Sequence, residues 1–369
     1  MGDGPVGDGP VTPPPGYRDG LADAWQMLMG VGQAAQRIGA AQRMAAAQPM
    51  PGRLAARGRT MPLTVISGFL GAGKTTLLNR LLMAPHGRRL AVLVNDFGAL
   101  NIDSALIERR DGDVVSLANG CACCSLASGL TNVLIELARA PSPPDAVVLE
   151  ASGIAEPRGI AHVALANPAV RLDGILTLVD AVGIEAQLAD PHLLPTVERQ
   201  ITAADLLVLN KLDLVPPGRL AGLRARLAAI APASRLIETT QADVPIDIVL
   251  GLEHVGQDHV GGNADRAVEP ARADMFQSWS FTSGALLDPV KLLALIERLP
   301  AGVLRAKGIL WLADRPDRRT VLQMVGRRWS LTADRPWLEA TPRSDLVVIA
   351  KAGAVAAQDL GGGLEDCRA

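Results

Sequence analysis

One glycine-rich octapeptide constrains the fold of this chain more than any other feature. It reads Gly-Phe-Leu-Gly-Ala-Gly-Lys-Thr at residues 68–75, after an apolar run at 63–66 and before a leucine-rich run at 77–82. Small residues between a strand and a helix let successive backbone N–H groups turn inward around phosphate oxygens, and the helix N-terminus adds partial positive charge. The alternative is a chance glycine-rich turn, but such a turn need not lie between a strand and a helix. The octapeptide therefore predicts a phosphate-binding loop.

The loop also supplies the first candidate site residues. Lys74 would neutralise the outer phosphates, and Thr75 would offer its hydroxyl to Mg²⁺. The residues that we expect to bind nucleotide here are Gly68, Gly71, Ala72, Gly73, Lys74, Thr75 and Thr76.

Composition restricts the class of protein. Of the 369 residues, 49% are hydrophobic but only 3% are aromatic, so the core must consist mainly of Ala, Val, Leu and Ile. The net charge of -2 argues against nucleic acid as a partner. No apolar stretch approaches the roughly 20 residues that span a bilayer, so we expect no membrane-embedded role and no membrane partner. The four cysteines are too few and too clustered for a secreted disulfide framework, so we expect a cytoplasmic protein.

The chain divides into five segments. Residues 1–60 hold Gly-Asp-Gly-Pro repeats and an Ala/Gln/Met-rich stretch, and we expect a disordered or low-complexity extension without a secretory signal. One hypothesis is that the functional chain begins at Met61. Residues 252–274 are polar and aperiodic, which is typical of a linker. Residues 275–351 predict a small α+β domain, and 352–369 a loose tail.

Strand and helix patterns alternate from residue 61 to 251. This alternation predicts an α/β fold, with a parallel sheet covered by helices on both faces. The expected strands of this domain are 63–67, 90–95, 114–117, 146–150, 175–180, 205–210 and 235–239. Expected helices include 130–140 and 219–230. In the second domain, strands are expected at 276–281, 303–312, 320–331 and 345–350, with a helix at 289–299.

A second nucleotide motif, Asn-Lys-Leu-Asp, occupies residues 210–213 at the end of an expected strand. The Asp213 carboxylate would accept hydrogen bonds from N1–H and the exocyclic amine of guanine, and adenine has no matching donor pair. Leaving buried groups unpaired costs about 1 to 3 kcal/mol each. Asn210 would brace the phosphate loop and the Lys211 stem would cover the base. An ordinary strand-end turn is the alternative, but after a phosphate loop the motif predicts GTP.

A third motif, Val-Val-Leu-Glu-Ala-Ser-Gly, lies between these two at residues 147–153. Glu150 at the strand tip would reach Mg²⁺ directly or through water, and the Gly153 N–H would sense the γ-phosphate. The alternative is an ordinary turn from strand to loop.

Three of the four cysteines, Cys121, Cys123 and Cys124, fall within four residues. Thiolates this close can converge on Zn²⁺, Co²⁺ or Cu⁺. Three sulfurs leave one tetrahedral position open, which suits metal transfer better than a closed structural site. A buried apolar turn and a redox-active pair are the alternatives. We expect Cys367 to be incidental.

Taken in order, these motifs resemble the CobW-type P-loop GTPases, and the resemblance covers about residues 61–351. The first domain's matching segments are 68–76, Asn95-Asp96-Phe97-Gly98, Cys121-Ala122-Cys123-Cys124, 150–157 and 210–213. The second domain's matching segments are Arg305-Ala306-Lys307-Gly308, Trp311 and Gly326-Arg327-Arg328-Trp329.

The resemblance implies a metallochaperone that couples GTP binding and Mg²⁺-dependent hydrolysis to the handling of Zn²⁺ or Co²⁺. We expect slow intrinsic hydrolysis because the sequence shows no obvious catalytic arginine finger. It implies that the three clustered cysteines bind this metal, and that the partner is a client metalloprotein or cobalt-insertion machinery, with a homodimer possible. Many members read Asn-Glu-Phe-Gly-Glu where this chain has Asp96 and Ala99. Asp96 keeps the charge on a shorter arm, whereas Ala99 cannot ligate a metal. Candidate catalytic residues are Lys74, Asp96, Glu150 and Gly153.

Two other functions are consistent with parts of this pattern. One is a GTP-regulated binding module in which the cysteines hold a purely structural zinc ion. The other is a small-molecule kinase, which the guanine-selective motif at residues 210–213 disfavours. A structural ion should stay bound through GTP hydrolysis, whereas a delivered ion should move to a chelator or client.

Overall fold

The computed structural model describes residues 60–94, 114–116, 124–251 and 275–369, except residue 339. The expected linker at 252–274 and all but the last residue of the N-terminal extension lie outside the described residues. Within the described residues, no helix is long and apolar enough to cross a membrane.

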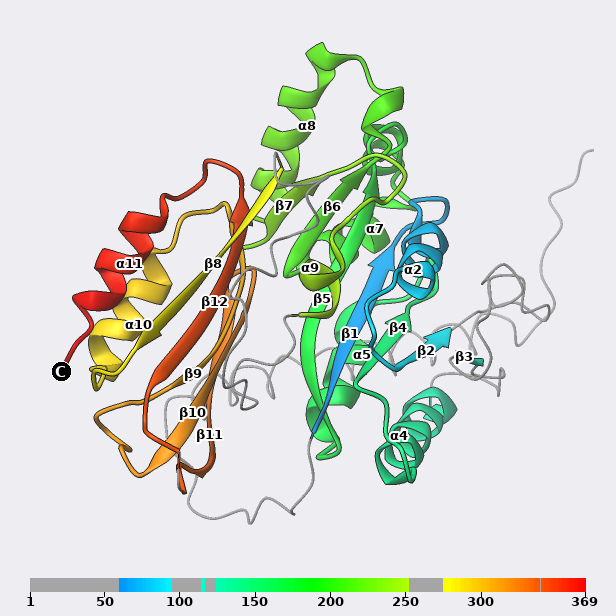
Figure 1. Cartoon of the computed structure of the whole chain (residues 1–369). Coiled ribbons are helices and arrows are strands. Elements are labelled where there is room, and N and C mark those ends of the chain that lie inside the picture. The colour runs from blue at the N-terminus through cyan, green and yellow to red at the C-terminus, as the bar shows by residue number, and fades with distance from the viewer. Residues whose placement is uncertain (1–59, 95–113, 117–123, 252–274, 339) are drawn as a thin grey trace, which may run out of the picture. The chain divides into compact units, whose positions relative to one another are not determined.

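Seven strands of the described chain form a parallel sheet in the order β3-β2-β4-β1-β5-β6-β7 (Figure 1). Their bounds are β1 Met61–Gly68, β2 Leu90–Val94, β3 Val114–Ser116, β4 Ala146–Glu150, β5 Val170–Asp180, β6 Leu206–Asn210 and β7 Arg235–Glu238. The expected parallel sheet is confirmed. The strand that leads into the phosphate loop, β1, lies in the middle of it.

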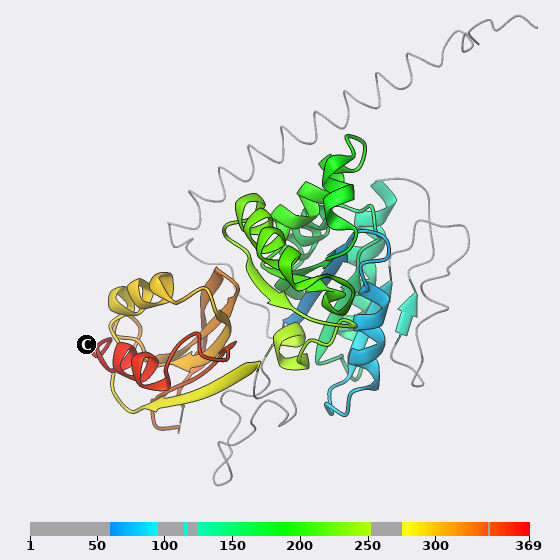
Figure 2. The same cartoon turned by 90° about the horizontal axis from the view of Figure 1, so that it is seen from above.

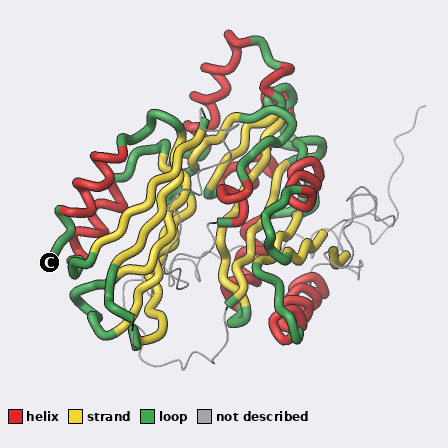
Figure 3. Tube along the Cα trace, in the orientation of Figure 1, coloured by secondary structure: helices red, strands yellow, loops and turns green. Residues whose placement is uncertain are grey.

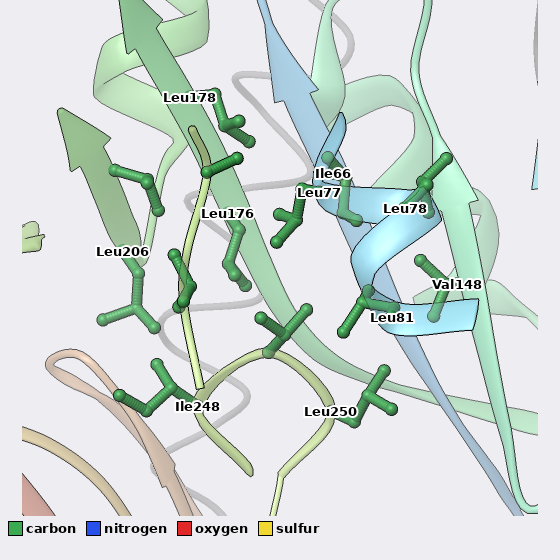
Figure 4. Close-up of a cluster of buried hydrophobic side chains, with 14 of the residues drawn as sticks. Ile66, Leu77, Leu78, Leu81, Val148, Leu176, Leu178, Leu206, Ile248 and Leu250 are labelled. Atoms are coloured by element: carbon green, nitrogen blue, oxygen red, sulfur yellow. The ribbon is translucent and has the colours of Figure 1, made fainter. Parts of the chain in front are cut away.

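Both faces of this sheet are buried, which explains why its strands are apolar at successive positions. In β6, Leu206 and Val208 belong to one hydrophobic cluster, whereas Leu207 and Leu209 belong to another. Alternate side chains of a strand point to opposite faces, so each cluster covers one face. The face of Leu206 packs against α2 (Lys74–Met83) and α9 (Ile246–Leu250), as Figure 4 shows for part of the cluster.

Five helices contribute to the buried clusters on the other face. They are α4 (Cys124–Arg139), α5 (Pro157–Ala166), α6 (Ile184–Ala189), α7 (Leu194–Ala203) and α8 (Pro217–Ile230). A helix must bury its apolar stripe, and a two-sided sheet offers each helix a surface for doing so.

The second group of strands is antiparallel, in the order β11-β10-β9-β12-β8. The bounds are β8 Phe276–Ser283, β9 Val303–Leu310, β10 Arg318–Val325, β11 Arg328–Pro336 and β12 Ser344–Lys351. Two helices, α10 (Pro289–Arg298) and α11 (Ala357–Glu365), lie side by side and share a hydrophobic cluster with this sheet (Figures 2 and 3). The expected α+β class of this part is confirmed.

The expected strand at 320–331 is instead a hairpin, in which β10 and β11 meet at Gly326. This glycine has a φ of 59°, in the left-handed region that favours glycine. A Cβ at this position would lie 2.3 Å from the Asp205 carbonyl oxygen, so the turn sits directly on the parallel-sheet domain. The segment conceals the turn because Gly326 is the only glycine in it and strand-forming residues lie on both sides.

The expectation of a loose tail at 352–369 is wrong. Helix α11 buries Leu360 and Leu364, and the Asp288 N–H donates to the Cys367 carbonyl at 2.7 Å. Three consecutive glycines, at 361–363, weaken the helix signal by about 1 kcal/mol each relative to alanine. Packing against α10 and the sheet offsets that cost. Cys367 is accordingly a buried core residue.

A buried ion pair joins the two sheets. Arg305 of β9, which is 3% exposed, donates to Asp173 of β5 at 2.7 Å and to the carbonyls of Ile248 and Val249 at 2.6 and 2.9 Å. Burial alone would raise the pKa of Asp173, but the charges of Arg305 and Arg171 outweigh it and hold this pKa below its ordinary value. The carboxylate therefore stays ionised within a matched polar environment.

We predict that Asp173→Asn lowers the free energy of unfolding by about 3 to 5 kcal/mol at pH 7, because it leaves the Arg305 charge buried without a counter-charge. A lowered folded-state pKa stabilises the protein above the unfolded-state value and loses that effect as pH falls through the folded-state value. The difference between wild type and variant should therefore shrink below about pH 4. Denaturant unfolding across pH measures both quantities.

The matched control is Asp314→Asn, which breaks the exposed pair with Arg315. An exposed pair contributes about 1 kcal/mol or less. Equal destabilisation by the two variants at pH 7 would contradict the role assigned to the buried pair.

Candidate nucleotide and metal site

Four strands of the parallel sheet end at one edge in polar or loop-forming residues. Three of these residues belong to the motifs found in the sequence, and the fourth, Asp180, belongs to none of them. Gly68, Glu150, Asp180 and Asn210 end β1, β4, β5 and β6. The strands are in register there, with Gly68 paired to Leu178 and Asp180 paired to Asn210. Ligands of open parallel sheets bind at this carboxyl edge. The four residues therefore lie along the edge at which ligands of such sheets bind.

The phosphate loop has a backbone that requires glycine. Gly68, Gly71 and Gly73 have φ values of 137°, 76° and 106°. A Cβ on Gly68 would lie 2.3 Å from the Leu178 carbonyl oxygen, and a Cβ on Gly73 would lie 2.4 Å from Nδ2 of Asn210. Two of the three glycines are thus required by close packing as well as by conformation.

Lys74 is the first residue of α2 and extends back over the loop. Its Nζ donates to the carbonyls of Gly68 at 3.0 Å and Phe69 at 3.4 Å, and the residue is 7% exposed. These contacts place the ammonium group at the mouth of the loop, where phosphate oxygens would lie. Thr76, two residues along, is exposed in the first turn of the helix.

The two predicted Mg²⁺ ligands are neighbours. The Thr75 hydroxyl donates to Oε1 of Glu150 at 3.4 Å, although the residues are 75 positions apart in the chain. A hydroxyl and a carboxylate are hard oxygen donors, the kind that Mg²⁺ binds while keeping several waters. The residues present therefore fit Mg²⁺ at the end of the phosphate loop.

Asn210 braces the phosphate loop, as its position predicted. Its Nδ2 donates to the Ala72 carbonyl at 2.9 Å, and its Oδ1 accepts from the Ala242 N–H at 2.7 Å. The amide is 2% exposed, so both bonds are shielded from water. The loop is thereby tied to β6, which carries the guanine motif.

Lys211 has a partner that the sequence reasoning missed. Its Nζ lies 2.7 Å from Oδ2 of Asp180, and its backbone is left-handed with a φ of 66°. Asp180 also accepts from the Val182 N–H at 2.9 Å. The sequence could have indicated Asp180, because it is an acidic residue at the tip of an apolar strand, as Glu150 is. Asp213 lies in the 3₁₀ turn η1 (Leu212–Leu214) and is exposed.

Part of the predicted site lies outside the described residues. This applies to Asp96, Ala99, Cys121 and Cys123, whereas Cys124 is the first residue of α4. Among the residues that the structure describes, no group of three His, Cys, Asp or Glu side chains is arranged to hold a metal ion. The thiolate site therefore stays a prediction.

Comparison with known proteins decides the family. The model for the CobW/HypB/UreG nucleotide-binding domain matches residues 62–238, and that for the cobalamin synthesis protein cobW C-terminal domain matches 276–368. The "Zinc chaperone CobW" of Pseudomonas aeruginosa is 31% identical, over 78% of this chain and 87% of its own length. The chain belongs to the CobW family. In this CobW-family chain, the match to the C-terminal domain model includes helix α11.

Other relatives of this CobW-family chain span similar lengths. The "Zinc chaperone YjiA" of Escherichia coli is 30% identical over 78% of this chain and 93% of its own. Among solved structures, Zn(II)-bound YjiA GTPase from E. coli is 25% identical, covers 84% of this chain and 100% of its own, and has a TM-score of 0.41.

We predict that Asp180→Asn weakens binding of GTP and GDP equally, by about fivefold, because Lys211 loses the charge that holds it at the base. The asparagine can still accept from the Val182 N–H, so the loop should keep its fold. Isothermal titration calorimetry measures both affinities. Asp190→Asn is the control, since Asp190 also caps a backbone N–H, that of His192, but contacts no nucleotide motif. Unchanged affinity in Asp180→Asn would contradict the assignment.

Proposed function

We propose that this chain is a GTP-hydrolysing metallochaperone, which couples GTP binding and hydrolysis to the binding and delivery of Zn²⁺ or Co²⁺ to a client metalloprotein. Support comes from the family and from the printed names of relatives. Besides the two zinc chaperones, a relative from Dictyostelium discoideum is called "Zinc-regulated GTPase metalloprotein activator 1" and is 30% identical over 75% of this chain and 68% of its own.

The position of β3 in the parallel sheet supports the proposed coupling between the nucleotide site and the cysteine motif. In the parallel sheet, Val94 pairs in register with both Glu150 and Ser116. Neighbouring strands lie about 4.8 Å apart, so the ends of β3 and β4 are roughly 10 Å apart at one edge. The cysteine motif begins five residues after Ser116 and runs into α4 at Cys124. The chain that leads to the thiolates thus leaves the sheet at the same edge as Glu150, the proposed Mg²⁺ ligand, two strands away from it.

The residues of the nucleotide site act mainly by positioning charge. The loop N–H groups and Lys74 would hold the phosphates, and Thr75 and Glu150 would hold Mg²⁺, which neutralises charge on the β- and γ-phosphate oxygens when bound. Asp213 would select guanine. The loops that carry Asp96 and Gly153 would be ordered by contacts with the γ-phosphate and released on hydrolysis. The segments that respond to GTP flank the cysteine motif in the chain.

The cargo metal would bind through the thiolates of Cys121, Cys123 and Cys124. Three thiolates leave a position through which a client ligand can enter. Such thiols must stay reduced, which is why we place the protein in the cytoplasm. We further propose a GTPase domain over 61–251 and a C-terminal domain from 275 that includes α11.

We predict that Cys121→Ser/Cys123→Ser/Cys124→Ser abolishes stoichiometric binding of Zn²⁺ or Co²⁺ while leaving GTP affinity within about twofold, because the loop and guanine motif are intact. Metal content by plasma mass spectrometry and GTP affinity by calorimetry measure the two effects. Wild-type loading should also weaken as pH falls, because thiolates must lose protons to bind.

Cys367→Ser is the matched control. Burial raises the pKa of the Cys367 thiol, and its Sγ lies 3.1 Å from the Gly363 carbonyl oxygen, so it is a poor ligand. Metal content should stay at the wild-type level. Undiminished metal content in the triple variant would refute the proposed thiolate site.

A further inference from the structure

Gln200 of α7 is a fully buried polar side chain that no motif of the sequence includes. The residue is 1% exposed. Its Nε2 donates to the carbonyls of Gly153 at 3.0 Å and Ala155 at 3.1 Å. A side-chain amide has two N–H donors, and here both are directed at one loop, which follows the strand that ends in Glu150. This loop is the one expected to sense the γ-phosphate.

The same loop contacts the phosphate loop on another side. A Cβ on Gly153 would lie 2.5 Å from Cδ2 of Leu70 and 3.0 Å from its backbone nitrogen. Gly153 therefore packs directly against the phosphate loop, and a larger residue here would require the exposed Leu70 side chain to shift. The Ala155 N–H donates to the Ser152 carbonyl at 2.9 Å and closes the turn. The two hydrogen bonds from Gln200 and the contact of Gly153 with Leu70 thus hold this turn beside the phosphate loop.

Helix α7 gives Gln200 a fixed base. The buried Thr177 hydroxyl of β5 donates to the Gln200 carbonyl at 3.0 Å. On the same helix, Val197 and Ile201 belong to the hydrophobic cluster that includes Val179 and Leu207 of the sheet. Because the helix is packed in this way, the amide is a fixed hydrogen-bonding partner for the loop.

We propose that Gln200 is the positioning residue that holds residues 152–155 where Gly153 meets the terminal phosphate, and that it thereby sets the preference for GTP over GDP. This inference rests on the proposed nucleotide site. Without the amide, the loop loses the two bonds that hold its carbonyls and can withdraw from the phosphate loop. GDP has no γ-phosphate for the loop to contact, so its affinity does not depend on the loop. Ligands shift an equilibrium only through such differential contacts.

The test is Gln200→Met, which keeps the length of the side chain but removes both donors. Calorimetry with Mg²⁺ would measure the Kd of a non-hydrolysable GTP analogue and of GDP. We expect the ratio of the two affinities to move roughly tenfold toward GDP, with the Kd of GDP within about twofold of wild type. An unchanged ratio in a folded variant overturns the proposal, because a side chain that only fills the core would lower the melting temperature without moving the ratio.

Ile201→Val is the matched control, since it trims the next buried residue of α7 without touching the loop, and its ratio should equal that of wild type. If Gln200→Met does not fold, Gln200→Asn keeps a buried amide on an arm one methylene shorter. It should shift the ratio in the same direction, and an unshifted ratio overturns the proposal. A wild-type protein that binds neither nucleotide would contradict the proposed function itself, whereas normal discrimination by both Gln200 variants contradicts only the role of Gln200.

Discussion

The side-chain amide of Asn210 is the contact on which the nucleotide site depends. It donates to the Ala72 carbonyl of the phosphate loop and accepts from the Ala242 N–H of the loop after β7. It also fills the space that a side chain at Gly73 would need. The amide thereby fixes the distance between the loop for the phosphates and the motif for the base. A buried amide with both of its ends bonded is a rigid connection, because breaking either bond leaves a polar group without water.

Register extends this arrangement along the sheet edge. Parallel strands in register bring Gly68, Glu150 and Asp180 to the same edge, so groups more than a hundred residues apart in the chain lie at one end of the sheet. The strand that leads to the cysteine motif is two strands away from Glu150. In the proposed mechanism, a separation of two strands would let a nucleotide-dependent loop influence the metal site without movement of whole domains. The Arg305–Asp173 pair meanwhile anchors the second sheet at a buried position of β5.

The parts that the sequence predicted are those that depend on local spacing. The phosphate loop and the Asn210–Asp213 motif are short segments whose chemistry requires particular neighbours in the chain, and continuous apolar runs predict buried parallel strands. The missed parts depend on contacts between distant residues. Gln200 lies 47 positions from Gly153, and Arg305 lies 132 from Asp173. Helix α11 was missed because its glycines oppose a helix that only packing can stabilise.

The proposed coupling requires that nucleotide state changes the affinity of the chain for Zn²⁺. Its most direct test is the Kd of Zn²⁺ for the full chain, measured by competition with a chelator, with either a non-hydrolysable GTP analogue or GDP bound in the presence of Mg²⁺. We predict that the two values differ by at least about fivefold, which corresponds to about 1 kcal/mol of coupling free energy. Zn²⁺ should change the affinity ratio of the two nucleotides by the same factor, because linkage is reciprocal. Equal Zn²⁺ affinity in both nucleotide states would contradict the account.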